Sequence, residues 1–154
     1  MASPPCLPSQ ASPALWSVGD DLVIDECDTL TTVDGFQSLT TLGGGLYLGE
    51  AYGGNDLLAT VNGFGALTEV GGDLYLYDMQ NLEGLAALVT IDGSITLIYN
   101  TQLGDVTALH GLEEVGGDLS IQYNYALTTE AAEALVDAID AIGGTVTVEN
   151  NGGG

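Results

Sequence analysis

A short motif that recurs six times most constrains how this chain can fold. In each copy, a glycine-containing turn precedes a segment in which apolar residues alternate with other residues. Recurrence of this kind is typical of repeat proteins, whose repeats bury their apolar faces against one another. Successive copies are 24, 28, 21, 24 and 27 residues apart and begin at Gly19, Gly43, Gly71, Asp92, Gly116 and Gly143.

The alternation within each copy predicts a β-strand. In the second copy, Leu46 and Leu48 would face the interior and Tyr47 the opposite side, because successive side chains of a strand point to opposite faces. The glycines ahead of each strand permit a sharp turn. Six strands, each with one intervening segment, indicate an α/β solenoid. We expect a right-handed parallel coil, similar to a β-helix, of about six repeats.

The segments between the strands carry a second pattern. Apolar residues fall at every third position, which favours short strands and 3₁₀-like turns on a second wall of the coil. One such run comprises Leu58, Val61, Phe64, Leu67 and Val70.

The two ends of the repeat differ from its middle. Residues 128–142 contain no glycine, and their apolar spacing predicts one C-terminal helix of about four turns. We expect Thr128 or Thr129 to cap this helix and Gly143 with Gly144 to end it. At the other end, Trp16 and Val18 are predicted to cover the first coil.

One polar register is also repeated. Asn100, Asn124 and Asn151 each lie eight positions after the start of a copy. Stacked asparagine side chains can bond backbone groups that a tight corner leaves unpaired. We therefore predict a structural asparagine ladder.

The charge of the chain restricts its partners. It has 22 Asp and Glu, no Lys or Arg, and a net charge of −22. Nucleic acid is excluded because phosphate contacts need basic side chains, and no apolar stretch is long enough for membrane insertion. A protein with a basic surface, a neutral glycan and loosely bound divalent cations remain compatible. The alternative is that the charge only keeps the protein soluble.

The composition divides the chain into three parts. Residues 1–14 form a tether rich in Pro and Ser, residues 15–151 hold the repeat, and residues 152–154 form a glycine linker stub. Cys6 and Cys27 lie near one end, which favours a disulfide on the first coil and therefore an oxidising compartment. The alternative is two free, buried thiols.

The repeat also resembles a known family. The segment VGGDLYLYDMQNLEGLAALVTIDGSITLIYN looks like the receptor L domain of insulin-type and epidermal-growth-factor-type receptors, and more like bacterial surface proteins with the same repeat. The closing EALVDAIDAIGGTVTVENNG is similar to the end of those domains, and leucine-rich-repeat proteins are wider relatives. The resemblance covers residues 15–151. It implies a right-handed solenoid that binds partners, without enzymatic activity or a cofactor.

The chain offers little for catalysis. His110 is the only histidine, and we interpret it as a solvated turn residue. Carboxylate pairs are frequent by number alone, so they carry little weight as a glycosidase signal. The densest acidic cluster is a weak candidate for Ca²⁺, which prefers oxygen ligands, although no EF-hand spacing occurs. This cluster comprises Asp20, Asp21, Asp25, Glu26 and Asp28.

The outward face of the strands is the best candidate binding surface. Exposed aromatic rings flanked by hydrogen-bonding groups suit a glycan or a protein. Alternatively, the tyrosines only stabilise the sheet as cross-strand neighbours. We expect a secreted or surface-tethered bacterial module for binding or adhesion, or instead a structural spacer or assembly subunit of the cell envelope. The candidate residues are Tyr47, Tyr75, Tyr77, Thr96 and Ile98.

Overall fold

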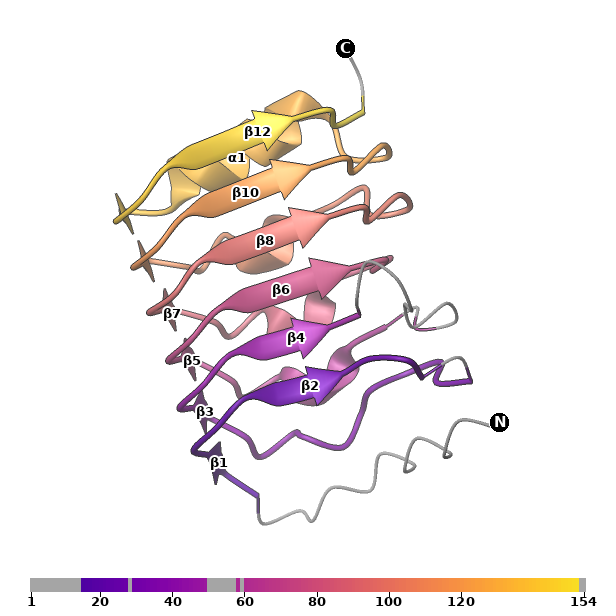
Figure 1. The fold of residues 1–154 in the computed structure, drawn as a ribbon, viewed down its shortest axis with the longest axis vertical. Coiled ribbons are helices and arrows are strands. Elements are labelled where there is room, and N and C mark those ends of the chain that lie inside the picture. Colours follow the sequence, from indigo (N-terminus) through magenta and orange to yellow (C-terminus); the bar gives the residue numbers. More distant parts are fainter. Residues whose placement is uncertain (1–14, 28, 50–57, 59, 153–154) are drawn as a thin grey trace.

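A computed structural model of the protein describes residues 15–27, 29–49, 58 and 60–152. The chain forms two parallel sheets of six strands each and one helix near its C-terminal end (Figure 1). It alternates between the sheets, so that each pass adds one strand to each of them. We call one such pass a coil. The stack of such coils is compatible with a solenoid-like parallel fold, as the repeat predicts.

The two sheets differ in strand length. The short-strand sheet consists of β1 (Ser17–Val18), β3 (Thr41–Leu42), β5 (Glu69–Val70), β7 (Thr90–Ile91), β9 (Glu114–Val115) and β11 (Ala141–Ile142). The long-strand sheet consists of β2 (Leu22–Ile24), β4 (Leu46–Leu48), β6 (Leu74–Tyr77), β8 (Ile95–Ile98), β10 (Leu119–Gln122) and β12 (Val146–Glu149). In both sheets the strands lie in chain order, so neighbouring coils in the sequence are neighbours in space.

Short helices connect the sheets behind the long strands. Three coils use the 3₁₀-helices η1 (Asn62–Phe64), η2 (Glu83–Leu85) and η3 (Thr107–Leu109). These helices and the two-residue strands confirm the second wall that the three-residue apolar period predicts. In each helix the last residue is fully buried, as Phe64 is in η1.

The C-terminal helix is shorter than predicted. Helix α1 (Thr129–Ala138) packs behind β12 in Figure 1 and is capped as expected, because the Thr128 hydroxyl accepts a hydrogen bond from the Ala131 N–H at 3.1 Å. It ends before the predicted glycine stop. Ile139 has extended backbone, and the Ala141 N–H bonds the Glu113 carbonyl at 3.0 Å. Pairing with β9 therefore ends the helix, a long-range contact that local spacing does not contain.

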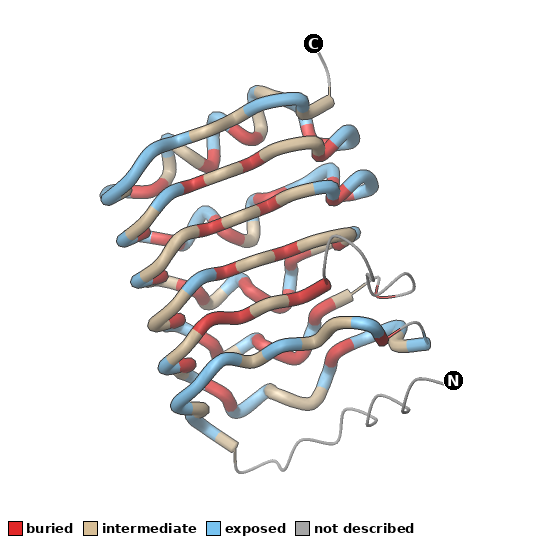
Figure 2. The backbone as a smooth tube through the Cα atoms, in the orientation of Figure 1, coloured by how far each residue is buried: buried red, intermediate tan, exposed pale blue. Residues whose placement is uncertain are grey.

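The core lies inside the coils. Along each central long strand, buried residues alternate with half-buried ones, as the tube in Figure 2 shows. Leu46 and Leu48 are fully buried, as predicted. One prediction at the first coil is wrong: Trp16 is 73% exposed, so it does not cover the coil, although Val18 packs against the core.

The predicted asparagine ladder is confirmed. Asn100 and Asn124 are fully buried. The Asn124 side-chain oxygen accepts from the Asn100 N–H at 2.9 Å, and its amide donates to the Leu97 carbonyl at 3.0 Å. Asn151 repeats the pattern on the next coil by accepting from the Asn124 N–H at 3.1 Å.

The ladder follows a backbone corner at the end of the long strands. The residue before each ladder position has positive φ, which turns the chain sharply out of the strand. The corner leaves N–H groups without a strand partner, and the asparagine oxygens accept them. Among the residues that the structure describes, the non-glycine residues with this conformation are Glu26, Asp78, Tyr99, Tyr123 and Asn150.

Candidate binding surface

The register of the long-strand sheet brings the five predicted binding residues together. Tyr47 pairs with Tyr75 and Tyr75 with Thr96, while Tyr77 pairs with Ile98. All five are half-buried and lie on the outward face of β4, β6 and β8. We call this group the strand-face patch.

Tyr47 is the member of the patch whose surroundings are best defined. A Cβ atom on Gly45 would lie 2.5 Å from its ring, so the glycine leaves room for the tyrosine. Burial raises the pKa of Tyr47, as do the nearby carboxylates of Asp73 and Asp21 and a hydrogen bond with Asp73. The phenol therefore stays protonated near neutral pH and can donate to a carboxylate.

A second group of aromatic residues lies where the long strands end. The rings of Tyr99 and Tyr123 stack with centroids 4.9 Å apart and planes 9° apart. The ring of Tyr77 lies 5.8 Å from that of Tyr99 at 56°. We call Tyr77, Tyr99 and Tyr123 the tyrosine row. Tyr99 is 37% exposed, and Tyr125, two residues beyond the row, is 57% exposed.

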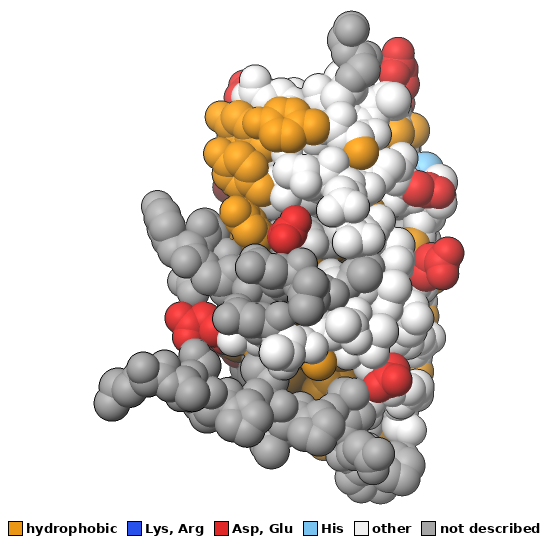
Figure 3. Space-filling view, turned by 90° about the vertical axis from the view of Figure 1, so that its right-hand side faces the viewer, with side chains coloured by type: hydrophobic (Ala, Val, Ile, Leu, Met, Phe, Trp, Pro, Cys, Tyr) orange, Lys and Arg blue, Asp and Glu red, His pale blue; other side chains and the backbone are white. Residues whose placement is uncertain are grey.

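The space-filling view faces this end of the long strands. Hydrophobic side chains gather in its upper left part, with an acidic side chain beside their lower end (Figure 3). Tyr77 belongs to both groups, so the tyrosine row continues from the strand-face patch at the ends of the long strands. Sequence reasoning missed Tyr99, Tyr123 and Tyr125. The available signal was the Tyr-Asn pair that recurs 24 residues apart, at 99–100 and 123–124.

Carboxylates flank the tyrosine row at both ends. Asp78 has the same corner conformation as Tyr99 and stands one coil before it. Glu149 lies one coil beyond Tyr123, whose N–H donates to the Glu149 carbonyl at 3.2 Å. The carboxylate of Glu149 is 3.5 Å from the side-chain nitrogen of Gln122. One acidic residue therefore lies in the first coil of the row, and another lies in the coil that follows its last member.

Another set of carboxylates stabilises the turns ahead of the long strands. Asp21 accepts the Gly45 N–H at 2.7 Å, and Asp73 accepts the Ser94 N–H at 2.7 Å. Asp118 accepts the Thr145 N–H at 2.6 Å and the Thr145 hydroxyl at 2.9 Å, and both bonds lower the pKa of Asp118. These aspartates join consecutive coils.

The weak Ca²⁺ candidate gains no support from this geometry. Asp21 already binds a backbone N–H, and Asp28 lies outside the described residues. Within residues 15–27, 29–49, 58 and 60–152, no three His, Cys, Asp or Glu side chains are grouped to hold a metal ion. Specific Ca²⁺ binding by the cluster of Asp20, Asp21, Asp25, Glu26 and Asp28 stays a prediction.

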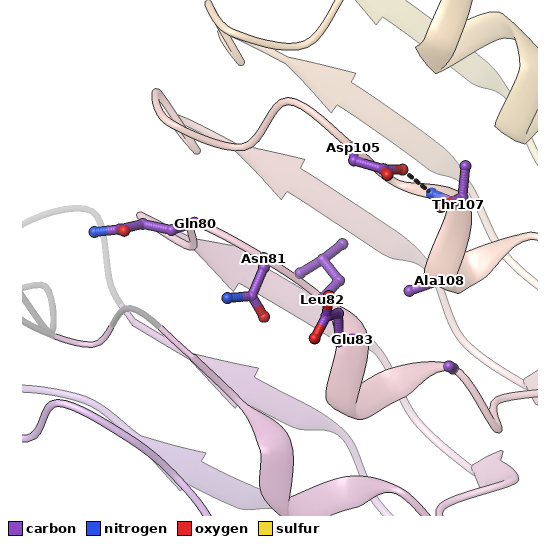
Figure 4. A pocket seen from close by; sticks show the side chains of 8 residues that line it. Gln80, Asn81, Leu82, Glu83, Asp105, Thr107 and Ala108 are labelled. Carbon is purple, nitrogen blue, oxygen red and sulfur yellow. Dashed lines mark hydrogen bonds between the residues drawn. The ribbon is translucent and has the colours of Figure 1, made fainter.

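A pocket of about 300 Å³ lies between η2 and η3 (Figure 4). Asp105 forms part of its wall, but this carboxylate accepts the Thr107 N–H at 2.7 Å, which lowers the pKa of Asp105. Ala108 stands where η1 and η2 have Gly63 and Gly84, and its methyl group forms part of the wall. The lining residues are Gln80, Asn81, Leu82, Glu83, Ala86, Asp105, Thr107 and Ala108.

The remaining predicted residues lie away from these surfaces. His110 is exposed at the end of η3, where its N–H donates to the Thr107 carbonyl at 3.1 Å. Cys27 is buried. The predicted disulfide stays a prediction, since Cys6 lies outside the described residues.

Comparison with protein-family models, curated proteins and solved structures finds no match for this chain. Among the helices of the described residues, none combines the length and the apolar character needed to cross a membrane. The fold and the surface therefore define the class of this protein only as a parallel, two-sheet repeat chain with an aromatic outer face.

Proposed function

We propose that this protein is a non-catalytic module for binding or adhesion. In this proposal the two sheets form a right-handed solenoid of the receptor L-domain type, secreted or held on a bacterial surface. The partner is a protein or a neutral glycan, and it contacts the outward face of the long strands.

The observation that carries the proposal is the strand-face patch. Three tyrosines, a threonine and an isoleucine lie side by side across β4, β6 and β8. Neighbouring strands are about 4.8 Å apart, so these side chains offer one surface rather than isolated contacts. Tyrosine combines a large apolar ring with a polar hydroxyl, which suits both sugar rings and protein surfaces.

A structural role is the second candidate. Tyr47 and Tyr75 are half-buried cross-strand neighbours, and such pairs stabilise a sheet without any ligand. In that case the protein would serve as a spacer or an assembly subunit of the cell envelope.

A triple variant separates the two candidates. Tyr47→Ala, Tyr75→Ala and Tyr77→Ala together remove the aromatic part of the patch, while Thr147→Ala alters the same outward face outside it. We expect the triple variant to lose binding to a glycan array or to cells while its circular dichroism spectrum stays unchanged. The Thr147→Ala control should bind normally. Equal binding by the wild type and a folded triple variant would reject the patch.

The array should be read with and without Ca²⁺. Equal binding under both conditions is expected if the acidic turn residues act only in the fold. Binding that requires Ca²⁺ would instead return the acidic cluster near Asp20 to consideration.

A further inference from the structure

We propose that the tyrosine row and its flanking carboxylates form a docking site for a basic segment of a partner protein, one that carries arginine side chains. The inference rests on the proposed binding function and names the chemistry of the partner. It also moves the main contact from the strand-face patch to the ends of β6, β8 and β10.

The geometry of the rings suits a guanidinium group. Tyr99 and Tyr123 stack against each other, and Tyr77 lies tilted against Tyr99, so the row is a continuous aromatic surface. Arginine is planar and weakly hydrated for a cation, and it packs on such surfaces by cation–π attraction and by stacking. The exposure of Tyr99 and Tyr125 leaves ring surface for a partner to contact.

The carboxylates at the ends of the row add directional contacts. Asp78 follows Tyr77 in the first coil of the row, and Glu149 lies in the coil after Tyr123, with its carboxylate 3.5 Å from the side-chain nitrogen of Gln122. Carboxylates bind guanidinium through charge-assisted hydrogen bonds, which are stronger than those between neutral groups. In this proposal the row offers stacking contacts along its length and ionic contacts near its two ends.

The charge of the whole chain favours the same partner. With 22 acidic residues and no Lys or Arg, the protein has a net charge of −22 and attracts cations. No arginine or lysine of the chain itself competes for the rings or for the carboxylates. A second copy of this chain is disfavoured as the occupant, because it brings the same negative charge and no Lys or Arg. A neutral glycan would leave the carboxylates without a countercharge.

The test must separate docking from general attraction to an acidic protein. The probe is a short peptide of alternating arginine and glycine, and its control has citrulline at each arginine position. Binding is measured by calorimetry at physiological salt. The informative variant is Tyr99→Ala with Tyr123→Ala, which removes two rings and keeps the net charge.

We expect the double variant to bind the arginine peptide about tenfold more weakly than the wild type, since each exposed cation–π contact contributes a few-fold in affinity. Tyr99→Phe with Tyr123→Phe should retain the binding, because phenylalanine keeps the ring. The citrulline peptide should not bind measurably. Circular dichroism checks that each variant is folded.

Two results would overturn the inference. One is equal affinity of the wild type and the folded alanine variant for the arginine peptide, which would mean that attraction is only general. The other is capture of neutral oligosaccharides that is lost in the alanine variant while peptide affinity is unchanged. That second result would leave the proposed binding function intact and change only its ligand.

Discussion

Single asparagine side chains form hydrogen bonds with the backbone N–H and C=O groups at the corners of this fold. Asn124 is fully buried, yet its side chain bonds the coil before it and the coil after it. A buried polar group without a partner costs about 1–3 kcal/mol. The ladder therefore stabilises the fold chiefly because its loss would leave several backbone groups unsatisfied at once.

The substitution Asn124→Ala tests this role. It removes the acceptor for the Asn100 N–H and the donor to the Leu97 carbonyl, both in the interior. We expect the free energy of unfolding, measured in urea, to fall by about 2–4 kcal/mol. Asn151→Ala is the matched control, because it removes similar bonds at a part-buried site that water can reach. Equal losses in the two variants would contradict the importance of burial.

The sequence predicts this ladder better than it predicts the tyrosine row, for a physical reason. An asparagine that recurs at one register of a buried corner is expected to bond the backbone there. A tyrosine at the neighbouring register can have several roles, and the position of its ring depends on the positive φ of Tyr99 and Tyr123. That conformation is uncommon outside glycine, asparagine and aspartate, so nothing in the local sequence indicates it.

At the level of elements, glycine sets how closely the 3₁₀-helices stack. A Cβ atom on Gly84 would lie 1.5 Å from the Val61 carbonyl oxygen, which is backbone and cannot rotate away. Gly65 differs, since a Cβ atom there meets nothing within 4 Å and its φ is −61°. Gly84 lies inside η2 and has no room for a side chain, whereas Gly65 follows η1 and has room for one.

Alanine at each position should change stability in opposite directions. Gly84→Ala must push η1 and η2 apart, which we expect to cost about 2 kcal/mol or more. Gly65→Ala should stabilise by about 0.4–1 kcal/mol, because alanine restricts the unfolded chain and fits the native conformation. Thermal and urea unfolding of both variants give the comparison. Destabilisation of similar size in both would show that helix packing does not depend on Gly84.

The strands are the elements that the spacing of apolar residues predicts correctly. Alternation of apolar residues predicts the long strands because half of each strand faces the core, and Leu46 and Leu48 follow that rule. The end of α1 was not predictable in this way. Ala141 and Ile142 continue the sequence pattern of the helix, but they pair with Glu114 and Val115 of β9, which lie 27 residues earlier in the chain.

For the whole molecule, charge opposes compactness. The chain has 22 Asp and Glu and no Lys or Arg, so no basic side chain of these two types offsets their repulsion. On α1, Glu133 and Asp137 are exposed and four residues apart, a spacing at which like charges destabilise a helix. Salt screens such repulsion, because the Debye length falls from about 10 Å at 0.1 M to about 3 Å at 1 M.

The melting temperature should therefore rise as sodium chloride increases between those concentrations. Glu133→Gln with Asp137→Asn should raise the melting temperature at low salt and reduce its dependence on salt, because one repulsive pair is removed. Differential scanning calorimetry provides the measurement. A melting temperature that is independent of salt, in wild type and variant alike, would show that repulsion among the carboxylates has no part in stability.

The chain order of the strands has a mechanical consequence. β1 and β12 lie at opposite ends of the stack in Figure 1, and the hydrogen bonds between sheet strands join each coil only to the next. Tension applied between these ends loads every junction in series. The weakest terminal coil would peel away first and release its length while the others stay folded. Such a stack would unfold one coil at a time under tensile force and dissipate energy at each step.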